Sequence, residues 1–330
     1  MKAVIWTKYG PPEVLQLREL EKPIPQENEV LIRIRATTVF PGDAEIRRFD
    51  VPFWAMWLPM RIFLGILKPT RIKVLGQEVA GDIEAVGKDV ERLKPGDQVI
   101  GITGFGFGGY AEYICLSEQM TMKKGLVAAK PHNMSYEEAA AIPVGGLNAW
   151  HFIRRAKIED GEKVLINGAG GSIGTFAVQL AKACGAEVTA VDKGAKLEML
   201  RSIGADHVID YEREDFTRNG ETYDVIFDVI DKSPYLRSMK SLKEKGRYLL
   251  VNTKPSNMLL PLWTRWTSSK KVICELARVT SEDFDSVREF IEAGQVKTVI
   301  DRCYRLDQIV DAHRYVDTKQ KAGNVVIKVW

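Results

Sequence analysis

The chain has 330 residues, which favours two domains, and 45% of them are hydrophobic, as in a globular protein. The net charge is +3 with acids and bases interspersed, so the sequence gives no electrostatic case for a nucleic-acid or a membrane surface. No apolar stretch reaches the roughly 20 residues of a membrane helix. The four cysteines are widely spaced, and we expect buried thiols in a protein of the reducing cytoplasm.

The first 125 residues are rich in β signals and turn residues. Strands are predicted at 1–6, 30–35, 79–86 and 98–102. Gly10-Pro11-Pro12 and Lys94-Pro95-Gly96-Asp97 read as turns. No helical alternation is visible here, and the longest apolar run, 51–67, is interrupted by Pro52, Pro59, Arg61 and Gly65. The pattern predicts a β-rich domain.

The pattern changes from Ser135, which with Glu138 forms a capping-box signature before an Ala-rich helix that Pro143 interrupts. Beyond it, helical segments alternate with short apolar runs at 164–167, 188–191, 207–209, 225–230 and 248–251, and 272–276 is a candidate sixth strand. A helix is expected at 282–293. This alternation predicts a doubly wound parallel sheet. The chain then returns to a strand at 299–305, a helix at 307–316 and a closing strand at 325–329.

The most informative motif is the small-residue run at 168–174, Gly-Ala-Gly-Gly-Ser-Ile-Gly. An apolar strand precedes it, and helical periodicity resumes at Thr175. Glycines permit a tight turn and close approach of the backbone, and a helix N-terminus offers N–H groups to a pyrophosphate. Asp192 ends the next strand 18 residues after Gly174, where a Rossmann site binds the adenosine ribose. The alternative is an ordinary turn whose small residues serve packing alone.

Several further motifs accompany the glycine turn in a fixed order. They are Lys2-Ala3-Val4, Gly76–Gly81, Leu93–Asp97, Gly109–Tyr113, Ala139–Pro143, Gly204–Tyr211 and Ala322–Ile327. Together they resemble the medium-chain dehydrogenase/reductase superfamily, and within it the zinc-free quinone oxidoreductase-like (zeta-crystallin-like) branch. The resemblance implies an α/β fold with a GroES-like catalytic and substrate domain formed by residues 1–125 and 295–330. A Rossmann NAD(P)-binding domain, residues 126–294, is inserted between them, with the active cleft between the two domains.

Zinc ligands are missing at the positions where zinc-dependent members of this superfamily carry them. Gln77 stands in Gly76-Gln77-Glu78 where those members have histidine, and the turn that carries their cysteine reads Phe40-Pro41-Gly42-Asp43. An amide is a poor zinc ligand beside imidazole or thiolate. We therefore expect no metal, and an enzyme that reduces an acceptor already electrophilic. The resemblance and this chemistry agree on an NAD(P)H-dependent oxidoreductase that passes hydride to a quinone or an α,β-unsaturated carbonyl.

Two alternatives to this reaction remain. One is an alcohol or aldehyde dehydrogenase of the same superfamily. The other is a non-catalytic, crystallin-like NAD(P)H-binding protein. The expected partners are a small-molecule substrate and a second copy of the chain, with no nucleic acid and no membrane.

Cofactor contacts are expected from the turn, from strand ends and from positions carried over from the family. They are Asn148, Gly168, Ala169, Gly170, Gly171, Ser172, Ile173, Gly174, Asp192, Lys193, Lys196, Tyr211, Val229, Ile230, Val251, Asn252, Gly323 and Asn324. Asp192 favours NAD(H), because a carboxylate repels a 2′-phosphate. Lys193, Lys196 and Tyr211 lie where related NADP-dependent reductases bind that phosphate, so the choice between NAD(H) and NADP(H) stays open, and the family favours NADPH. Either lysine could instead pair with Asp192 or stay solvated.

The substrate side is less defined. Asp43 lies where the family often has a cleft aspartate, and it either orients the substrate or bonds the turn backbone. Phe40, Trp54 and Trp57 either form an aromatic wall for a planar acceptor or pack in a core. Trp263, with Trp266, is expected in a loop near the cleft, as a lid or as a dimer contact.

Overall fold

The computed structural model describes residues 1–330 except 51–53, 120–124, 252–256 and 258, and it leaves the side chains of 54–56, 265 and 267 undescribed. The chain divides into two compact units: unit 1 is Met1–Val144 with Ile300–Trp330, and unit 2 is Gly145–Val299. The first boundary lies 19 residues beyond the expected one, at 125. The reason is that β7 (Leu126–Ala129) bonds to β5 (Gln98–Ile102) in the sheet of unit 1.

Unit 1 is built on a seven-stranded sheet, in the order β14-β15-β3-β4-β5-β7, with β6 also paired to β3. The remaining strands of this sheet are β3 (Glu29–Thr38), β4 (Glu78–Val86), β6 (Tyr113–Ser117), β14 (Ile300–Arg305) and β15 (Asn324–Lys328). β15 runs antiparallel to β3, with Val326 opposite Thr38. Both ends of the chain therefore build this unit, as predicted.

A second layer of unit 1 packs its own core. β1 (Lys2–Trp6) pairs with β2 (Leu15–Glu19). Side chains of β1 and β15 share a buried cluster with α1 (Pro41–Arg48) and α10 (Ile309–Asp317). A short 3-10 turn, η1 (Pro12–Val14), also contacts α10.

Two helices of unit 1 contradict the purely β prediction for the first 125 residues. α1 begins after Phe40, and α2 (Trp54–Leu64) contains Pro59. The sequence of α2 is apolar on every side, so it shows no 3.6-residue alternation from which a helix can be predicted. None of the helices in the described part of the chain has both the length and the hydropathy needed to span a bilayer.

Unit 2 is a six-stranded parallel sheet in the order β10-β9-β8-β11-β12-β13. Its strands are β8 (Lys163–Asn167), β9 (Glu187–Asp192), β10 (His207–Asp210), β11 (Tyr223–Asp228), β12 (Leu242–Leu250) and β13 (Lys271–Cys274). The order reverses between β8 and β11, which makes their carboxyl ends the switch point of a doubly wound sheet. The predicted fold class is confirmed.

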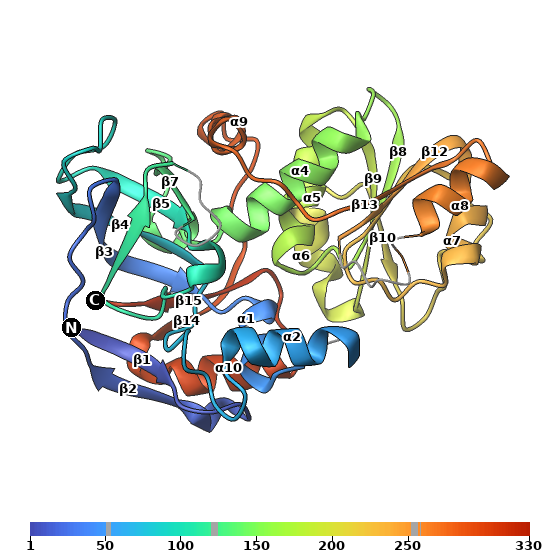
Figure 1. Ribbon diagram of the computed structural model, residues 1–330. Coiled ribbons are helices and arrows are strands. Elements are labelled where there is room, and N and C mark those ends of the chain that lie inside the picture. The colour runs from blue at the N-terminus through green and yellow to red at the C-terminus, as the bar shows by residue number, and fades with distance from the viewer. Residues whose placement is uncertain (51–53, 120–124, 252–256, 258) are drawn as a thin grey trace. The chain divides into compact units, whose positions relative to one another are not determined.

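Helices cover both faces of the sheet in unit 2 (Figure 1). α5 (Ser172–Ala183) and α6 (Leu197–Ser202) lie on one face, and α7 (Tyr235–Lys240) and α8 (Leu260–Thr267) lie on the other. α4 (Leu147–Ala156) packs on α5 and on α9 (Ser281–Glu292). In unit 1, the short helix α3 (Tyr136–Ala139) has the predicted capping box of Ser135 and Glu138. Of the four thiols expected to be buried, only Cys115 is; Cys184 and Cys274 are half-buried, and Cys303 is exposed on β14.

Candidate functional site

The glycine turn of unit 2 is fixed to the end of the neighbouring strand. The backbone N–H groups of Gly168 and Ala169 both donate to the carbonyl of Val191, at 3.0 and 3.1 Å. Gly168 has φ +83°, and a Cβ there would lie 2.6 Å from Cγ2 of Ile230. A residue with a side chain at 168 is therefore excluded by both backbone conformation and space.

Helix α5 begins directly after this turn. Its N-cap is Gly171, which has no side chain to cap the helix. Any side chain at Gly174 would lie 2.4 Å from the carbonyl oxygen of Gly168, so α5 packs directly on the turn. A Cβ at Gly171 would have its nearest neighbour 3.6 Å away. Open space next to the positive end of a helix dipole fits a pyrophosphate group.

Asp192 ties three elements of this region together. One carboxylate oxygen accepts from the N–H of Gly170 at 2.8 Å, and the other accepts from the N–H of Lys193 at 2.8 Å. Lys196 Nζ lies 2.9 Å from the same carboxylate, and both side chains are nearly buried. Of the alternatives left open for the lysines, Lys196 pairs with Asp192, and Lys193 instead pairs with Glu212 at 3.1 Å in an exposed position.

The other expected cofactor contacts of unit 2 follow strand ends, except Asn148, which lies on a helix. Tyr211 is exposed just after β10, and Asn148 is half-buried on α4. Val229 and Ile230 were expected to end the fourth strand, but β11 ends at Asp228 and they follow it. Val251 likewise follows β12. Asn252 lies outside the described residues.

Asp228 is a polar residue of this edge that the sequence did not single out. It is fully buried and accepts from Asn167 Nδ2 and from the Tyr248 hydroxyl, both at 3.0 Å. It also accepts from the N–H groups of Ile230 and Asp231. Burial raises its pKa. Asp228 thus holds the turn that carries Ile230 against Gly168. In the sequence, the pattern that could have identified Asp228 is an acidic residue within an apolar run.

Unit 1 contains a second polar cluster, centred on Asp43 in the first turn of α1. Its side chain is fully buried and accepts from the N–H of Phe40 at 3.2 Å. It also accepts from the N–H of Gly76 and from Gln77 Nε2, both at 3.3 Å. Burial raises the pKa of Asp43 to about 7. These bonds hold the turn at Phe40 to the Gly76-Gln77 segment, which is the backbone role left open above.

Glu78 is the second buried acid of this cluster. It accepts from the Thr38 hydroxyl and, at 2.7 Å, from the N–H of Val144. Burial raises its pKa to about 8; the Asp43 charge adds to that rise and buried Lys321 opposes it. Lys321 donates to the carbonyl of Gly323 at 2.6 Å, next to buried Asn324. Gly323 and Asn324, expected to contact cofactor, therefore lie in unit 1 with the acids.

The donor set of this cluster is a poor fit to zinc. It consists of two carboxyls and the Gln77 amide, with neither thiolate nor imidazole. Within the described ranges, no group of three or more His, Cys, Asp and Glu is arranged to hold a metal ion.

The expected aromatic residues do not form one group within either unit. Phe40 is half-buried beside Gly42, and Trp57 is half-exposed with its ring edge-on to Phe49 at 5.8 Å. The side chain of Trp54 is outside the described part of the structure. Trp263 is 65% exposed and lines a 220 Å³ hollow between α7 and α8 in unit 2.

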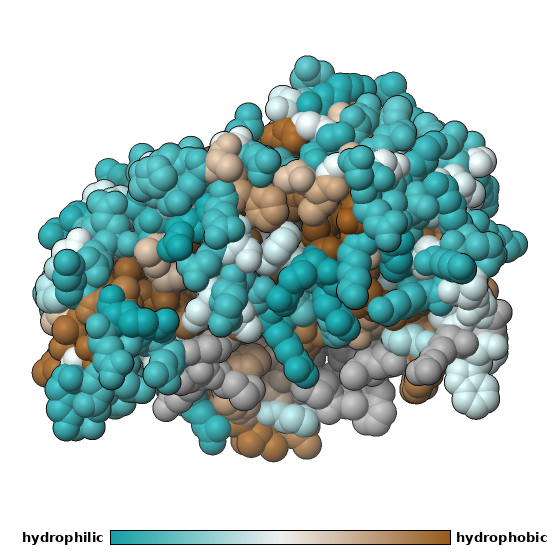
Figure 2. All heavy atoms as spheres, turned by 90° about the horizontal axis from the view of Figure 1, so that it is seen from above, coloured by the Kyte–Doolittle hydropathy of each residue, from teal (hydrophilic) through white to brown (hydrophobic). Residues whose placement is uncertain are grey.

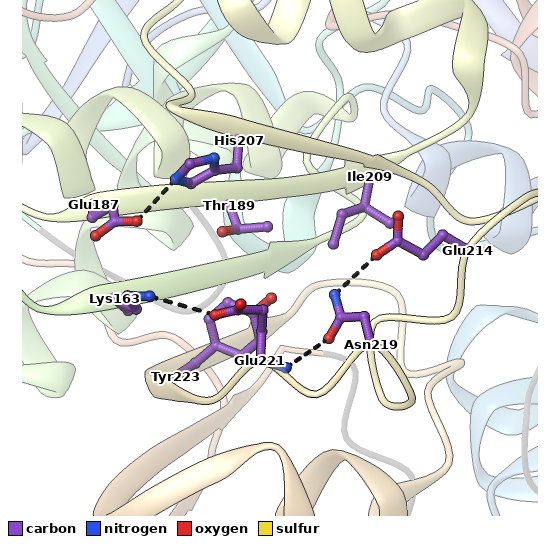
Figure 3. A pocket seen from close by; sticks show the side chains of 9 residues that line it. All are labelled: Lys163, Glu187, Thr189, His207, Ile209, Glu214, Asn219, Glu221 and Tyr223. Carbon is purple, nitrogen blue, oxygen red and sulfur yellow. Dashed lines mark hydrogen bonds and ion pairs between the residues drawn. The ribbon is translucent and has the colours of Figure 1, made fainter.

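A larger hollow of about 310 Å³ lies at the amino edge of the sheet in unit 2 (Figure 3). Lys163, Glu187, His207 and Tyr223, the first residues of four strands, line it. Its charged groups are paired with one another, as in His207 with Glu187 at 2.8 Å and Lys163 with Glu221 at 3.4 Å. Dinucleotides bind at the carboxyl edge of such sheets, so this hollow is separate from the glycine turn.

The buried acids predict how stability depends on pH. Folded Glu78 keeps its proton up to about pH 8, whereas the unfolded chain releases it near the ordinary value of 4.5. The contribution of protonated Glu78 to stability is fully present below about pH 4.5 and is lost as the pH rises through about 8. In this window Glu78 lowers the free energy of unfolding by up to about 1.4 kcal/mol per pH unit.

We expect Glu78→Gln to flatten this fall, while Glu19→Gln, on the exposed surface of β2, leaves it unchanged. Urea unfolding followed by circular dichroism from pH 5 to 8.5 measures both variants. Parallel curves for the parent and Glu78→Gln would show that Glu78 is ionised throughout.

The open space at Gly171 predicts a change that removes binding without unfolding the chain. Its φ of −94° suits any residue, so Gly171→Ala and Gly171→Asp are both expected to fold. The aspartate brings a negative charge to the candidate pyrophosphate site, and we expect at least tenfold weaker NADPH binding, since a close like-charge contact is worth about 4 kcal/mol near a surface. Gly171→Asn is the control for side-chain size, because asparagine has nearly the size of aspartate but no charge. Calorimetric titration measures affinity; unchanged affinity in a folded Gly171→Asp variant rules out this site.

Comparisons with known proteins agree with this architecture. The family described as alcohol dehydrogenase GroES-like domain matches residues 26–126, and the family described as zinc-binding dehydrogenase matches residues 203–327. A 2-methylene-furan-3-one reductase from Solanum lycopersicum is 32% identical, over 99% of this chain and 79% of its own. A chloroplastic NADPH-dependent alkenal/one oxidoreductase from Arabidopsis thaliana is 31% identical, with the same coverage of both chains.

Among solved structures, the quinone oxidoreductase from Coxiella burnetii is similar over the full chain. The TM-score is 0.87 at 27% identity, and the match covers 100% of this chain and 99% of the other. The relatives cover nearly the whole chain, and the strand orders of both units agree with the expected fold. The chain therefore belongs to the medium-chain dehydrogenase/reductase superfamily, in its quinone-oxidoreductase-like branch.

Proposed function

We propose that this protein is an NADPH-dependent reductase of quinones or α,β-unsaturated carbonyls that works without zinc. The observation that carries the proposal is the donor set of the buried cluster in unit 1. Where a zinc-dependent relative needs thiolate and imidazole, this chain has Asp43, Gln77 and Glu78. Asp43 already accepts from the Gly76 N–H and from the Gln77 amide, and Glu78 accepts from the Val144 N–H. The glycine turn of unit 2 supports the nicotinamide cofactor.

The proposed reaction suits a site without a Lewis acid. When bound, the reduced nicotinamide supplies a hydride; the acceptor takes it at carbon, its oxygen gains the negative charge, and a proton from water completes the product. An alcohol substrate, by contrast, has a hydroxyl that must first be ionised, and zinc is the usual means. We assign to Asp43 and Gln77 the positioning of the Phe40 and Gly76 turns, because their mutual bond joins these segments.

The proposed preference for NADPH is supported by the charges around Asp192. Lys196 neutralises its carboxylate, and Lys193 and Tyr211 are exposed next to it. A 2′-phosphate approaching this edge would therefore meet two ion pairs, Asp192 with Lys196 and Glu212 with Lys193, and no unpaired Asp192 charge. The name of the Arabidopsis relative, an NADPH-dependent enzyme, points the same way.

Oxidation of NADPH and NADH followed at 340 nm, with one quinone, one alkenal and one enone, tests the proposed reaction. We expect turnover of at least one acceptor, with unchanged rates after exhaustive dialysis against a chelator. Reduction of NADP⁺ or NAD⁺ by primary and secondary alcohols is the counter-assay. Activity with alcohols alone, or activity lost on chelation and restored by zinc, would contradict the proposal; cofactor binding without any turnover would favour a binding protein.

The pairing of Asp192 with Lys196 yields a separate prediction about coenzyme choice. Asp192→Ser removes the negative charge and frees Lys196, so the ratio of kcat/KM for NADPH to that for NADH should rise at least about tenfold, or 1.4 kcal/mol. Serine removes the charge but keeps a small side chain with a hydrogen-bond acceptor. Adding Lys196→Met to this variant should reverse the gain.

Lys193→Met serves as the matched control, because Lys193 pairs with Glu212 and not with Asp192. We expect a smaller change in the coenzyme ratio from it than from Lys196→Met. An unchanged ratio in Asp192→Ser would show that neither group faces the adenosine ribose.

A further inference from the structure

The outward face of helix α2 in unit 1 is apolar. Six large side chains are exposed between residues 57 and 67, with exposed fractions from 44% for Phe63 to 88% for Leu67. They are Trp57, Leu58, Ile62, Phe63, Ile66 and Leu67; the last two follow the end of α2 at Leu64, and the Trp57 ring also contacts Phe49 on the packed side. Leu58 and Ile62 are four residues apart, as are Pro59 and Phe63, so on the helix they form one face. A helix on a protein surface ordinarily has polar residues there, and most of the face seen in Figure 2 is hydrophilic.

The exposed face is held in place by contacts on the opposite side of α2. The Arg61 guanidinium stacks on the rings of Tyr9 and Phe49, at 4.0 and 4.1 Å from their centroids. The Tyr9 hydroxyl donates to the carbonyl of Gly65 at 2.6 Å, and Leu64 is buried in the core. The apolar side chains are therefore presented by a packed element of the fold.

The charged residues in the segment that contains α2 all have one sign. From residue 51 to residue 77 the chain has Arg61, Lys68, Arg71 and Lys73 but neither aspartate nor glutamate. Lys68, Arg71 and Lys73 are exposed and lie just after the apolar residues. The overall net charge of +3 conceals this local excess of positive charge.

We propose that residues 57–73 form a docking surface for a lipid bilayer with anionic headgroups. Apolar and aromatic side chains flanked by lysine and arginine are the composition of elements that lie in the membrane interface. The apolar side chains enter the boundary between headgroups and acyl chains, where tryptophan is favoured, and the cations face the lipid phosphates. A second copy of the chain fits less well, because a two-fold contact would bring the same cations together.

Co-sedimentation of the full chain with vesicles tests the docking surface independently of the reaction. We expect binding to phosphatidylcholine vesicles containing about one third phosphatidylserine, weaker binding to phosphatidylcholine alone, and a decrease with added salt. The double variant Ile62→Ser, Leu67→Ser should bind at least about tenfold more weakly. Replacing Lys68, Arg71 and Lys73 by glutamine should weaken binding by about fivefold for each cation removed.

Ile24→Ser is the matched control, because Ile24 is 86% exposed in the same unit but outside the docking surface. Its binding should equal that of the parent. Circular dichroism and NADPH affinity report whether each variant is folded. Failure of the parent to bind anionic vesicles, or equal binding by the Ile62→Ser, Leu67→Ser variant, would overturn the proposal. The proposal would also be overturned if the parent self-associates through this face. In that case the parent would sediment as an oligomer without vesicles, the Ile62→Ser, Leu67→Ser variant would sediment as a monomer, and neither would bind vesicles.

Discussion

The candidate cofactor site depends on the hydrogen bonds and the ion pair of the Asp192 carboxylate. By accepting from Gly170 and Lys193 it joins the glycine turn to the end of β9, and its ion pair with Lys196 makes its burial tolerable. The Ile230 side chain lies against Gly168 of this turn, and Asp228, at the end of β11, accepts a hydrogen bond from the Ile230 N–H. Asp192 and Asp228 end β9 and β11, the strands on either side of β8, and both therefore hold the groups that surround the glycine turn.

Unit 1 uses buried acids in a related way, but with a different balance of charge. Backbone N–H groups, Gln77 and Thr38 satisfy Asp43 and Glu78. Burial is the largest influence on both carboxyls and raises both pKa values toward neutrality, although Lys321 opposes the rise at Glu78. Asp192 in unit 2 differs from these two acids, because it forms an ion pair with Lys196 at 2.9 Å.

Much of the fold could be predicted from the sequence because its signals are local. β8, the glycine turn and α5 follow one another within 163–183, and each has its own pattern of apolar residues or glycines. The missed features depend on contacts distant in sequence. β7 belongs to unit 1 through its pairing with β5, and Glu78 is recognised as a buried acid only once Thr38 and Val144 surround it. Lys196 has no pattern of its own that distinguishes pairing with Asp192 from solvation.

Helix α2 shows why composition averaged over a chain is a weak guide to surfaces. An apolar run interrupted by Pro59 and Arg61 looks like a poorly ordered core segment, because its sequence lacks a polar side. The fold buries only part of it: Arg61, a cation, goes inward against Tyr9 and Phe49, while Ile62 and Leu67 face outward. This arrangement inverts the usual distribution of charged and apolar residues. An apolar patch exposed on a packed helix is typical of an interaction site, and this is the physical basis of the proposed docking surface.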